Sequence, residues 1–159
     1  MRNSDAAALV ALLAERNLTV STAESCTGGL IASSIVDVPG ASAVFPGGAV
    51  TYAPSVKTAL LGVPEDLIEK RGVVSADVAA AMAEGARKRF CTDLAVSVTG
   101  VAGPDGGTPE TPVGCVYIGI ATEKRTVTFR ETIPGDREEV RRGAAERAIR
   151  HCLTELQNE

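Results

Sequence analysis

Two spacings of apolar residues recur along the chain, one typical of helices and one typical of strands. The clearest helical stripe is Val78, Met82, Ala86 and Phe90, at a spacing of four, which predicts a helix over 76–90 with Ser75 as its cap. Short apolar runs between glycines, prolines and polar turn residues predict strands. We expect strands at 18–23, 47–52, 94–98, 116–121 and 126–133, and further helices at 30–36, 54–61, 64–70 and 137–156, after a first helix capped by Ser4 or Asp5.

The order of these elements predicts the fold class. The first two strands each lead into a helix, which favours parallel neighbours, whereas the last two form an antiparallel hairpin. We therefore expect an α/β fold with a mixed sheet flanked by helices in three layers. The length of 159 residues fits a single domain over 1–159. In such sheets ligands bind outside the carboxyl ends of strands, where the polar, glycine-rich segments after Glu24 and Val98 lie here.

The composition indicates which residues fill the core, where the protein is located and which class of partner it binds. Hydrophobic residues make up 45% of the chain but aromatic residues only 3%, so alanine, valine, leucine and isoleucine must fill the core. The net charge of −4 disfavours a nucleic-acid partner. No signal-peptide pattern opens the sequence, and no apolar run reaches the roughly 18 residues of a membrane span. We expect a cytoplasmic protein with a small-molecule partner and no membrane, and helix 76–90 offers a flat surface suited to a homo-oligomer.

The cysteines give no sign of a metal site. Cys26, Cys91, Cys115 and Cys152 are widely spread and include no C-x-x-C pair. This spacing favours reduced thiols over disulfides or a zinc site, so we expect no metal.

Residues 22–29 (TAESCTGG) lie between an apolar run and the helix at 30–36, and they are the first candidate site. This context puts the hydroxyl of Ser25 at the end of a strand, beside the unpaired N–H groups of the next helix. Such groups hold an anion, or the oxyanion that forms when a hydroxyl attacks a carbonyl. The context alone leaves Ser25 equally a nucleophile or a helix cap. Cys26 is either an alternative nucleophile or a small buried residue.

The histidine count restricts the chemistry open to Ser25. The only histidine, His151, lies inside the last helix, where its neighbours give it no catalytic role, and we interpret it as a surface or cap histidine. The base for a serine nucleophile must then come from another residue type, and lysine is the usual substitute.

Lys57 is the lysine in the most suggestive place. It falls in the first turn of a helix that Pro54 opens, where the helix dipole lowers the pKa of a cation, as burial also would. A lysine that is neutral near pH 7 accepts a serine proton. Tyr52, at the preceding strand end, is placed to bridge the hydroxyl and the amine. From the residues alone the alternatives stay open: a solvated helix lysine and a tyrosine packed at the rim.

Two further segments carry candidate binding groups. The loop 100–114 matches neither the Walker A pattern nor G-x-G-x-x-G. Its glycines let backbone N–H groups approach a phosphate or carboxylate, or the loop is simply a mobile connection. In the last helix, arginines such as Arg141 and Arg142 alternate with acidic residues, which is typical of a solvated face. Arg137 is the exception, because it follows a Pro-Gly-Asp turn and is placed to clamp an anion.

Taken together, these segments resemble the CinA C-terminal domain family, which includes the C-terminal domain of the competence/damage-inducible protein CinA and stand-alone nicotinamide-nucleotide amidases. The resemblance implies hydrolysis of the carboxamide of nicotinamide mononucleotide to nicotinate mononucleotide and ammonia, without a metal or other cofactor. It runs from about 19 to 156 and rests on 22–29 (TAESCTGG), 37–40 (DVPG), 50–52 (VTY), 61–63 (LGV), 72–75 (GVVS), 99–108 (TGVAGPDGGT), 112–114 (PVG) and 135–137 (GDR).

The resemblance also implies roles for individual residues. Ser25 is the nucleophile, Lys57 its base and Tyr52 the helper of that base, while Thr27 becomes the better candidate for the helix cap. For substrate binding it implies Glu24, Thr27, Gly28, Gly29 and the loop 99–108, with Thr99, Gly100, Gly103, Gly107 and Thr108. We also expect Cys26 and Arg137 to bind substrate.

The sequence departs from the family pattern at two positions. The usual Tyr-Ser-Asn tripeptide reads Tyr52-Ala53-Pro54, and the lysine usually found before Pro-Val-Gly is Thr111. Both changes favour an alternative, a non-catalytic nucleotide-binding module of the same fold. A role as an interaction protein in competence or DNA damage rests only on the family's name. We also expect the stand-alone form, without the N-terminal domain that longer members carry.

Overall fold

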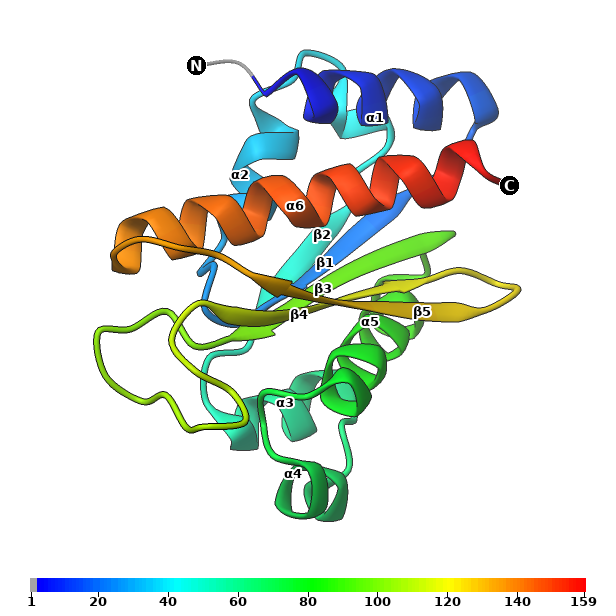
Figure 1. Cartoon of the computed structure of the whole chain (residues 1–159). Helices are drawn as coiled ribbons and strands as arrows, with labels where there is room; N and C mark the ends of the chain where they lie inside the picture. The colour runs from blue at the N-terminus through cyan, green and yellow to red at the C-terminus, as the bar shows by residue number, and fades with distance from the viewer. Residues whose placement is uncertain (1–2) are drawn as a thin grey trace.

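Within residues 3–159, which the computed structural model describes, five strands form one mixed sheet in the order β2–β1–β3–β4–β5 (Figure 1). β1 pairs in parallel with both β2 and β3, whereas β3–β4 and β4–β5 are antiparallel. The predicted mixed α/β sheet and its late hairpin are confirmed. The strands are β1 Val20–Glu24, β2 Gly47–Val50, β3 Leu94–Gly100, β4 Cys115–Ala121 and β5 Thr126–Thr132.

Helices cover both faces of this sheet, in agreement with the three-layer prediction. α1, α2 and α6 lie on one face, and α3, α4 and α5 lie on the other (Figure 1). In this part of the chain no helix combines the length and the apolar character needed to cross a bilayer. The helices are α1 Ser4–Arg16, α2 Leu30–Val36, α3 Pro54–Leu61, α4 Glu65–Arg71, α5 Ala76–Phe90 and α6 Arg137–Gln157, with one 3₁₀ turn at Ala41–Ala43.

Side-chain caps explain where two of the helices begin. Ser75 caps α5 as predicted, since its hydroxyl accepts a hydrogen bond from a first-turn N–H. The prediction for α1 is wrong: the cap is Asn3, whose side-chain oxygen accepts from the N–H groups of Asp5 (3.0 Å) and Ala6 (3.2 Å). Ser4 is therefore already the first helical residue.

Two apolar cores hold the layers together, one on each face of the sheet. The larger lies beneath α1 and α6 and is filled by aliphatic side chains such as Ile118, Ile120 and Ile149. The smaller lies beneath α5, where small residues let neighbouring elements approach closely. A Cβ at Gly85 of α5 would overlap the carbonyl oxygen of Leu61 at the end of α3. This close packing fixes α3 relative to the sheet.

The carboxyl ends of the parallel strands β1 and β3 meet at one edge of the sheet. Glu24 is opposite Val98, and the N–H of Ser25 donates to the carbonyl of Val98 at 3.0 Å. The two polar segments that sequence analysis singled out therefore start side by side. β3 continues to Gly100, beyond its predicted end, because Gly100 still pairs with Val116 of β4.

Candidate active site

Ser25 directly follows β1 and opens the turn that leads into α2. The carbonyl of Ser25 accepts a hydrogen bond from the N–H of Gly28 at 3.1 Å. Gly28 and Gly29 have φ values of 59° and 101°, a left-handed conformation that favours glycine. The turn leaves the Ser25 side chain only 8% exposed, at the edge of a cleft.

Lys57 reaches the hydroxyl of Ser25 from α3. The side chain is fully buried, and its Nζ lies 2.9 Å from Ser25 Oγ, 2.6 Å from the carbonyl oxygen of Thr51 and 3.3 Å from that of Tyr52. A carbonyl only accepts hydrogen bonds, and a neutral amine has two N–H groups and one lone pair. When Lys57 is neutral, donation to both carbonyls therefore directs the lone pair at Ser25.

Burial shifts the pKa values of Lys57 and Cys26, which lie beside Ser25. It lowers the pKa of Lys57 from 10.5 to about 8, so roughly one tenth of the amine is neutral at pH 7. It raises the pKa of the Cys26 thiol to about 11, so that this thiol stays protonated at neutral pH. Since the thiolate is the reactive form of cysteine, the geometry favours Ser25 over Cys26 as the nucleophile.

Glu24 is a buried carboxylate that caps α2. Its oxygens accept hydrogen bonds from the N–H groups of Gly29 (3.2 Å), Ile31 (2.9 Å) and Ala32 (3.1 Å). The prediction that Thr27 is the cap is therefore wrong, because a carboxylate already occupies the positive end of the helix. Glu24 faces α2 rather than the cleft, and the N–H groups expected to receive a ligand are taken.

A cleft of about 270 Å³ opens beside Ser25, close to the lower size of small-molecule pockets, about 300 Å³. It lies between the Ser25 turn, the end of β3 and the start of α6. Val73 and Val74 also form its wall and were not predicted to do so, although their segment belongs to the motif 72–75. The predicted site residues that line the cleft are Ser25, Cys26, Tyr52, Thr99, Gly100, Gly103 and Arg137. Pro54, one of the two positions that differ from the family pattern, lines it as well.

The second half of the glycine-rich loop folds back on itself, outside the cleft. Thr108 and Thr111 share a hydrogen bond between their hydroxyls at 2.9 Å, and Gly107 packs against Val113. Gly107 and Thr108, expected to bind substrate, therefore do not line the cleft. Thr111, the second departure from the family pattern, belongs to this same turn. The predicted binding residues Thr27, Gly28 and Gly29 also lie outside the lining, in the turn before α2.

Tyr52 and Arg137 form the rim of the cleft. Tyr52 is 62% exposed, and its hydroxyl accepts a hydrogen bond from Arg137 Nη2 at 3.1 Å. Arg137 Nη1 donates to the carbonyl of Gly103 at 2.6 Å. Among the described residues, the Tyr52 hydroxyl makes no hydrogen bond to Ser25 or Lys57, so only its main-chain carbonyl touches the amine. Over residues 3–159 Arg137 has no acidic partner in a salt bridge, although Asp105 lines the same cleft.

Arg141 is a contact that sequence analysis missed, because the charge pattern of its helix indicated a solvated face. Its Nε donates to the carbonyl of Cys26 at 2.9 Å, and its Nη2 donates to the carbonyl of Thr27 at 3.2 Å. α6 therefore reaches both the rim of the cleft and the turn that carries Ser25.

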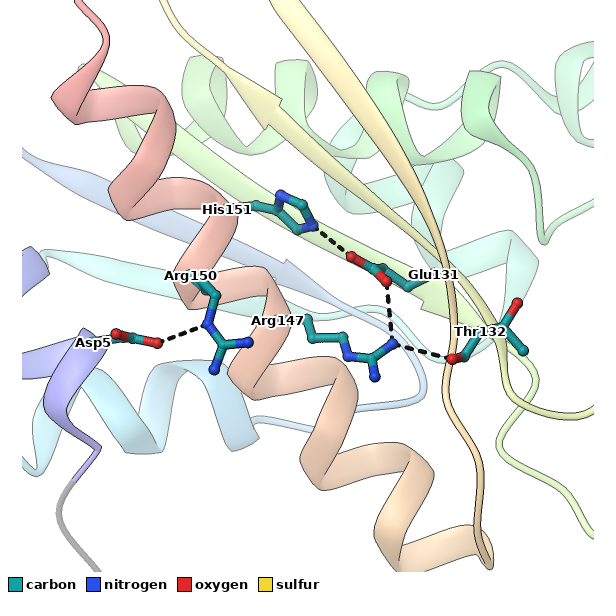
Figure 2. Close-up of polar contacts among 6 residues, drawn as sticks. All are labelled: Asp5, Glu131, Thr132, Arg147, Arg150 and His151. Atoms are coloured by element: carbon teal, nitrogen blue, oxygen red, sulfur yellow. Dashed lines mark hydrogen bonds and ion pairs between the residues drawn. The ribbon is translucent and has the colours of Figure 1, made fainter.

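His151 belongs to a polar contact between α6 and β5 (Figure 2). Its ring stacks on Phe129, with centroids 3.9 Å apart, and its Nε2 lies 2.7 Å from Glu131 Oε1. Arg147 completes the contact by pairing with the other carboxylate oxygen of Glu131 at 3.1 Å. His151 lines no part of the cleft, so it packs the helix against the sheet rather than sitting free at a helix end.

The comparisons with known proteins agree on one family. A family model for the CinA C-terminal domain matches residues 2–156. A CinA-like protein from Geotalea uraniireducens is 53% identical over 133 residues, which are 84% of this chain and 32% of that protein. A CinA-like protein from Akkermansia muciniphila is 51% identical over 147 residues, 92% of this chain and 36% of that protein. The chain thus spans about a third of the length of these relatives.

Solved structures share the fold over nearly the whole chain. The competence/damage inducible protein CihA from Agrobacterium tumefaciens has a TM-score of 0.92 at 36% identity and covers 99% of this chain and 98% of its own. A competence-damaged protein (CinA) superfamily protein from Escherichia coli has a TM-score of 0.92 at 31% identity, with coverage of 99% and 90%. Sequence and structure together show that this chain belongs to the CinA C-terminal domain family.

Proposed function

We propose that the protein is a serine amidohydrolase that converts nicotinamide mononucleotide to nicotinate mononucleotide and ammonia. One observation carries this proposal: Lys57 is buried, and its Nζ lies 2.9 Å from Ser25 Oγ while two carbonyls occupy its remaining donor directions. A buried amine with a lowered pKa, aimed at a serine hydroxyl, is the arrangement needed for general-base activation.

The reaction follows from this pair in two steps. Neutral Lys57 takes the proton of Ser25, whose oxygen bonds to the carboxamide carbon and forms a tetrahedral oxyanion. The carbon–nitrogen bond then breaks, and the leaving nitrogen takes the proton from the Lys57 ammonium and departs as ammonia. In the second step water gives a proton to Lys57 and its oxygen bonds to the acyl carbon. The bond from that carbon to Ser25 Oγ then breaks, which releases the nicotinate carboxyl, and the Lys57 ammonium returns its proton to Ser25 Oγ.

Arg137 is the group that would hold the substrate's phosphate. Its guanidinium lies at the rim of the same cleft and has two anchoring contacts, to Tyr52 and to Gly103. A planar guanidinium recognises a phosphate through two parallel hydrogen bonds, and here no carboxylate in residues 3–159 competes for it through a salt bridge. In this pose Tyr52 orients Arg137 rather than Ser25.

The test is ammonia release from nicotinamide mononucleotide by the wild type and by Ser25→Ala. We expect turnover by the wild type and none above background by Ser25→Ala, while both proteins are stabilised against thermal unfolding by the nucleotide. Stabilisation of the wild type without ammonia release would show a nucleotide-binding module instead. Equal turnover by both proteins would remove Ser25 from the mechanism.

The activity should rise with pH through the pKa of Lys57. Only the neutral amine accepts the Ser25 proton, and with a pKa of about 8 roughly one tenth of it is neutral at pH 7. We expect kcat/KM to increase about tenfold between pH 7 and pH 9 and then level off. A pH profile of ammonia release, measured over a range where circular dichroism shows no unfolding, checks this. A profile that is flat or falls across that interval would contradict a lysine base.

A further inference from the structure

The tetrahedral intermediate needs hydrogen-bond donors that the start of α2 does not supply. The N–H groups of Gly29, Ile31 and Ala32 are all bound to the carboxylate of Glu24. The N–H groups of Cys26 and Thr27, which directly follow Ser25, have no acceptor among residues 3–159. The residue after the nucleophile is also where serine hydrolases with a strand–turn–helix nucleophile place an oxyanion donor.

The directions of these two N–H groups are set from the other end of their peptide units. In a planar trans peptide the C=O and the N–H point in opposite directions, so a fixed carbonyl fixes the donor. The carbonyl of Ser25, which shares a peptide with the Cys26 N–H, accepts from Gly28. The carbonyl of Cys26, which shares a peptide with the Thr27 N–H, accepts from Arg141 Nε at 2.9 Å.

Arg141 is held close to this turn. Its Nη2 also donates to the carbonyl of Thr27, and a Cβ at Gly28 would lie 3.1 Å from the same nitrogen. The missing side chain of Gly28 thus makes room for the guanidinium, in addition to allowing the left-handed φ. A cation on a carbonyl also polarises the peptide and strengthens the N–H on its far side.

We propose that Arg141 is a positioning residue of the hydrolytic site: by holding the carbonyls of Cys26 and Thr27 it fixes the turn so that the Cys26 N–H stabilises the oxyanion. The Thr27 carbonyl shares its peptide with the Gly28 N–H, which donates to the Ser25 carbonyl and so sets the direction of the Cys26 N–H. This role rests on the proposed amidase function. Arg141 does not line the cleft, and its contacts in the turn are to main-chain carbonyls, so we expect its effect to fall on the transition state rather than on substrate binding.

The test compares Arg141→Met and Arg141→Lys with the matched control Arg142→Met. Arg142 is the next residue of α6 and is exposed, and its one ion pair within residues 3–159 is with Glu138. We expect Arg141→Met to lower kcat about 30-fold, less than the roughly 100-fold to 1000-fold lost when an oxyanion donor is removed outright, with KM changed less than about threefold. Arg141→Lys retains one of the two contacts, so its kcat should lie between those of the wild type and Arg141→Met. The kcat of Arg142→Met should match that of the wild type.

A thioamide analogue of the substrate separates positioning from a merely structural role. Sulfur accepts hydrogen bonds more weakly than oxygen, so an intact oxyanion site prefers the amide strongly. We expect Arg141→Met to reduce the ratio of amide to thioamide kcat/KM, whereas a general loss of structure would lower both rates equally. If Arg141→Met does not fold, the same ratio is measured on Arg141→Lys.

The outcomes keep the two proposals apart. Absence of ammonia release by the wild type would remove the proposed function. An active wild type together with Arg141 variants that keep its kcat, or its amide-to-thioamide ratio, would overturn the positioning role alone.

Discussion

Replacing Lys57 by methionine is expected to lower kcat for carboxamide hydrolysis by about 10⁴-fold, the scale seen when one member of a catalytic serine triad is lost. Methionine fills a similar volume but accepts no proton, so Ser25 stays an un-ionised alcohol. Binding should persist, because the Lys57 side chain is enclosed and Arg137 is untouched. Single-turnover ammonia release and thermal stabilisation by the nucleotide measure the two effects separately.

Two further variants test whether Lys57 acts as a neutral amine that accepts a proton. Lys57→Arg keeps the positive charge, but a guanidinium stays protonated at any pH that the protein tolerates, so it should be as inactive as Lys57→Met. Lys70→Met removes an exposed lysine of α4 and should leave kcat unchanged. An active Lys57→Arg enzyme would mean that charge, and not proton transfer, is what Lys57 provides.

Replacing Glu24 by alanine is expected to reduce the free energy of unfolding by about 3 kcal/mol, which is at the upper end for hydrogen bonds to a charged group. The change leaves the N–H groups of Gly29, Ile31 and Ala32 without their acceptor at the start of α2. It also removes the negative charge from the positive end of the helix. Urea unfolding at pH 7 gives the difference directly.

Controls for this prediction separate the cap from the loss of a carboxylate in general. Glu24→Gln keeps the side-chain length and one acceptor oxygen, so it should cost less than Glu24→Ala. Glu69→Ala removes an exposed carboxylate of α4 and should change stability by less than about 0.5 kcal/mol. If Glu24→Ala is no more harmful than Glu69→Ala, the three hydrogen bonds do not stabilise α2 as argued.

The parts of the fold that were predicted from the sequence are those that depend on local chemistry. α3 and α5 have their expected bounds because Pro54 presets the first turn of one and Ser75 caps the other. Strand ends were predicted less well because the neighbouring strand decides them: β3 continues past Val98 for as long as β4 pairs with it.

In the candidate site, too, contacts that follow from local sequence were predicted and contacts that depend on tertiary structure were not. The pairing of Ser25 with Lys57 was within reach because the lone histidine left lysine as the remaining base and both residues follow parallel strands. The contacts of Glu24 and Arg141 could not be predicted, because each depends on how the chain folds in three dimensions. A carboxylate at a strand end also fits a pocket wall, and an arginine spaced between acidic residues also fits a solvated face, until the chain brings Arg141 to a carbonyl 115 residues away.

The two arginines of α6 that reach the site stand at positions 137 and 141, about one helical turn apart. One would bind the far end of the substrate and the other holds the turn where bond cleavage occurs. The distance between the starting points of these two side chains is then set by the rise of four helical residues, about 6 Å, and not by a loop. A one-residue insertion between them would rotate one arginine by about 100° away from the other, so natural variation in substrate length should appear in the loops opposite α6 rather than within its first turns.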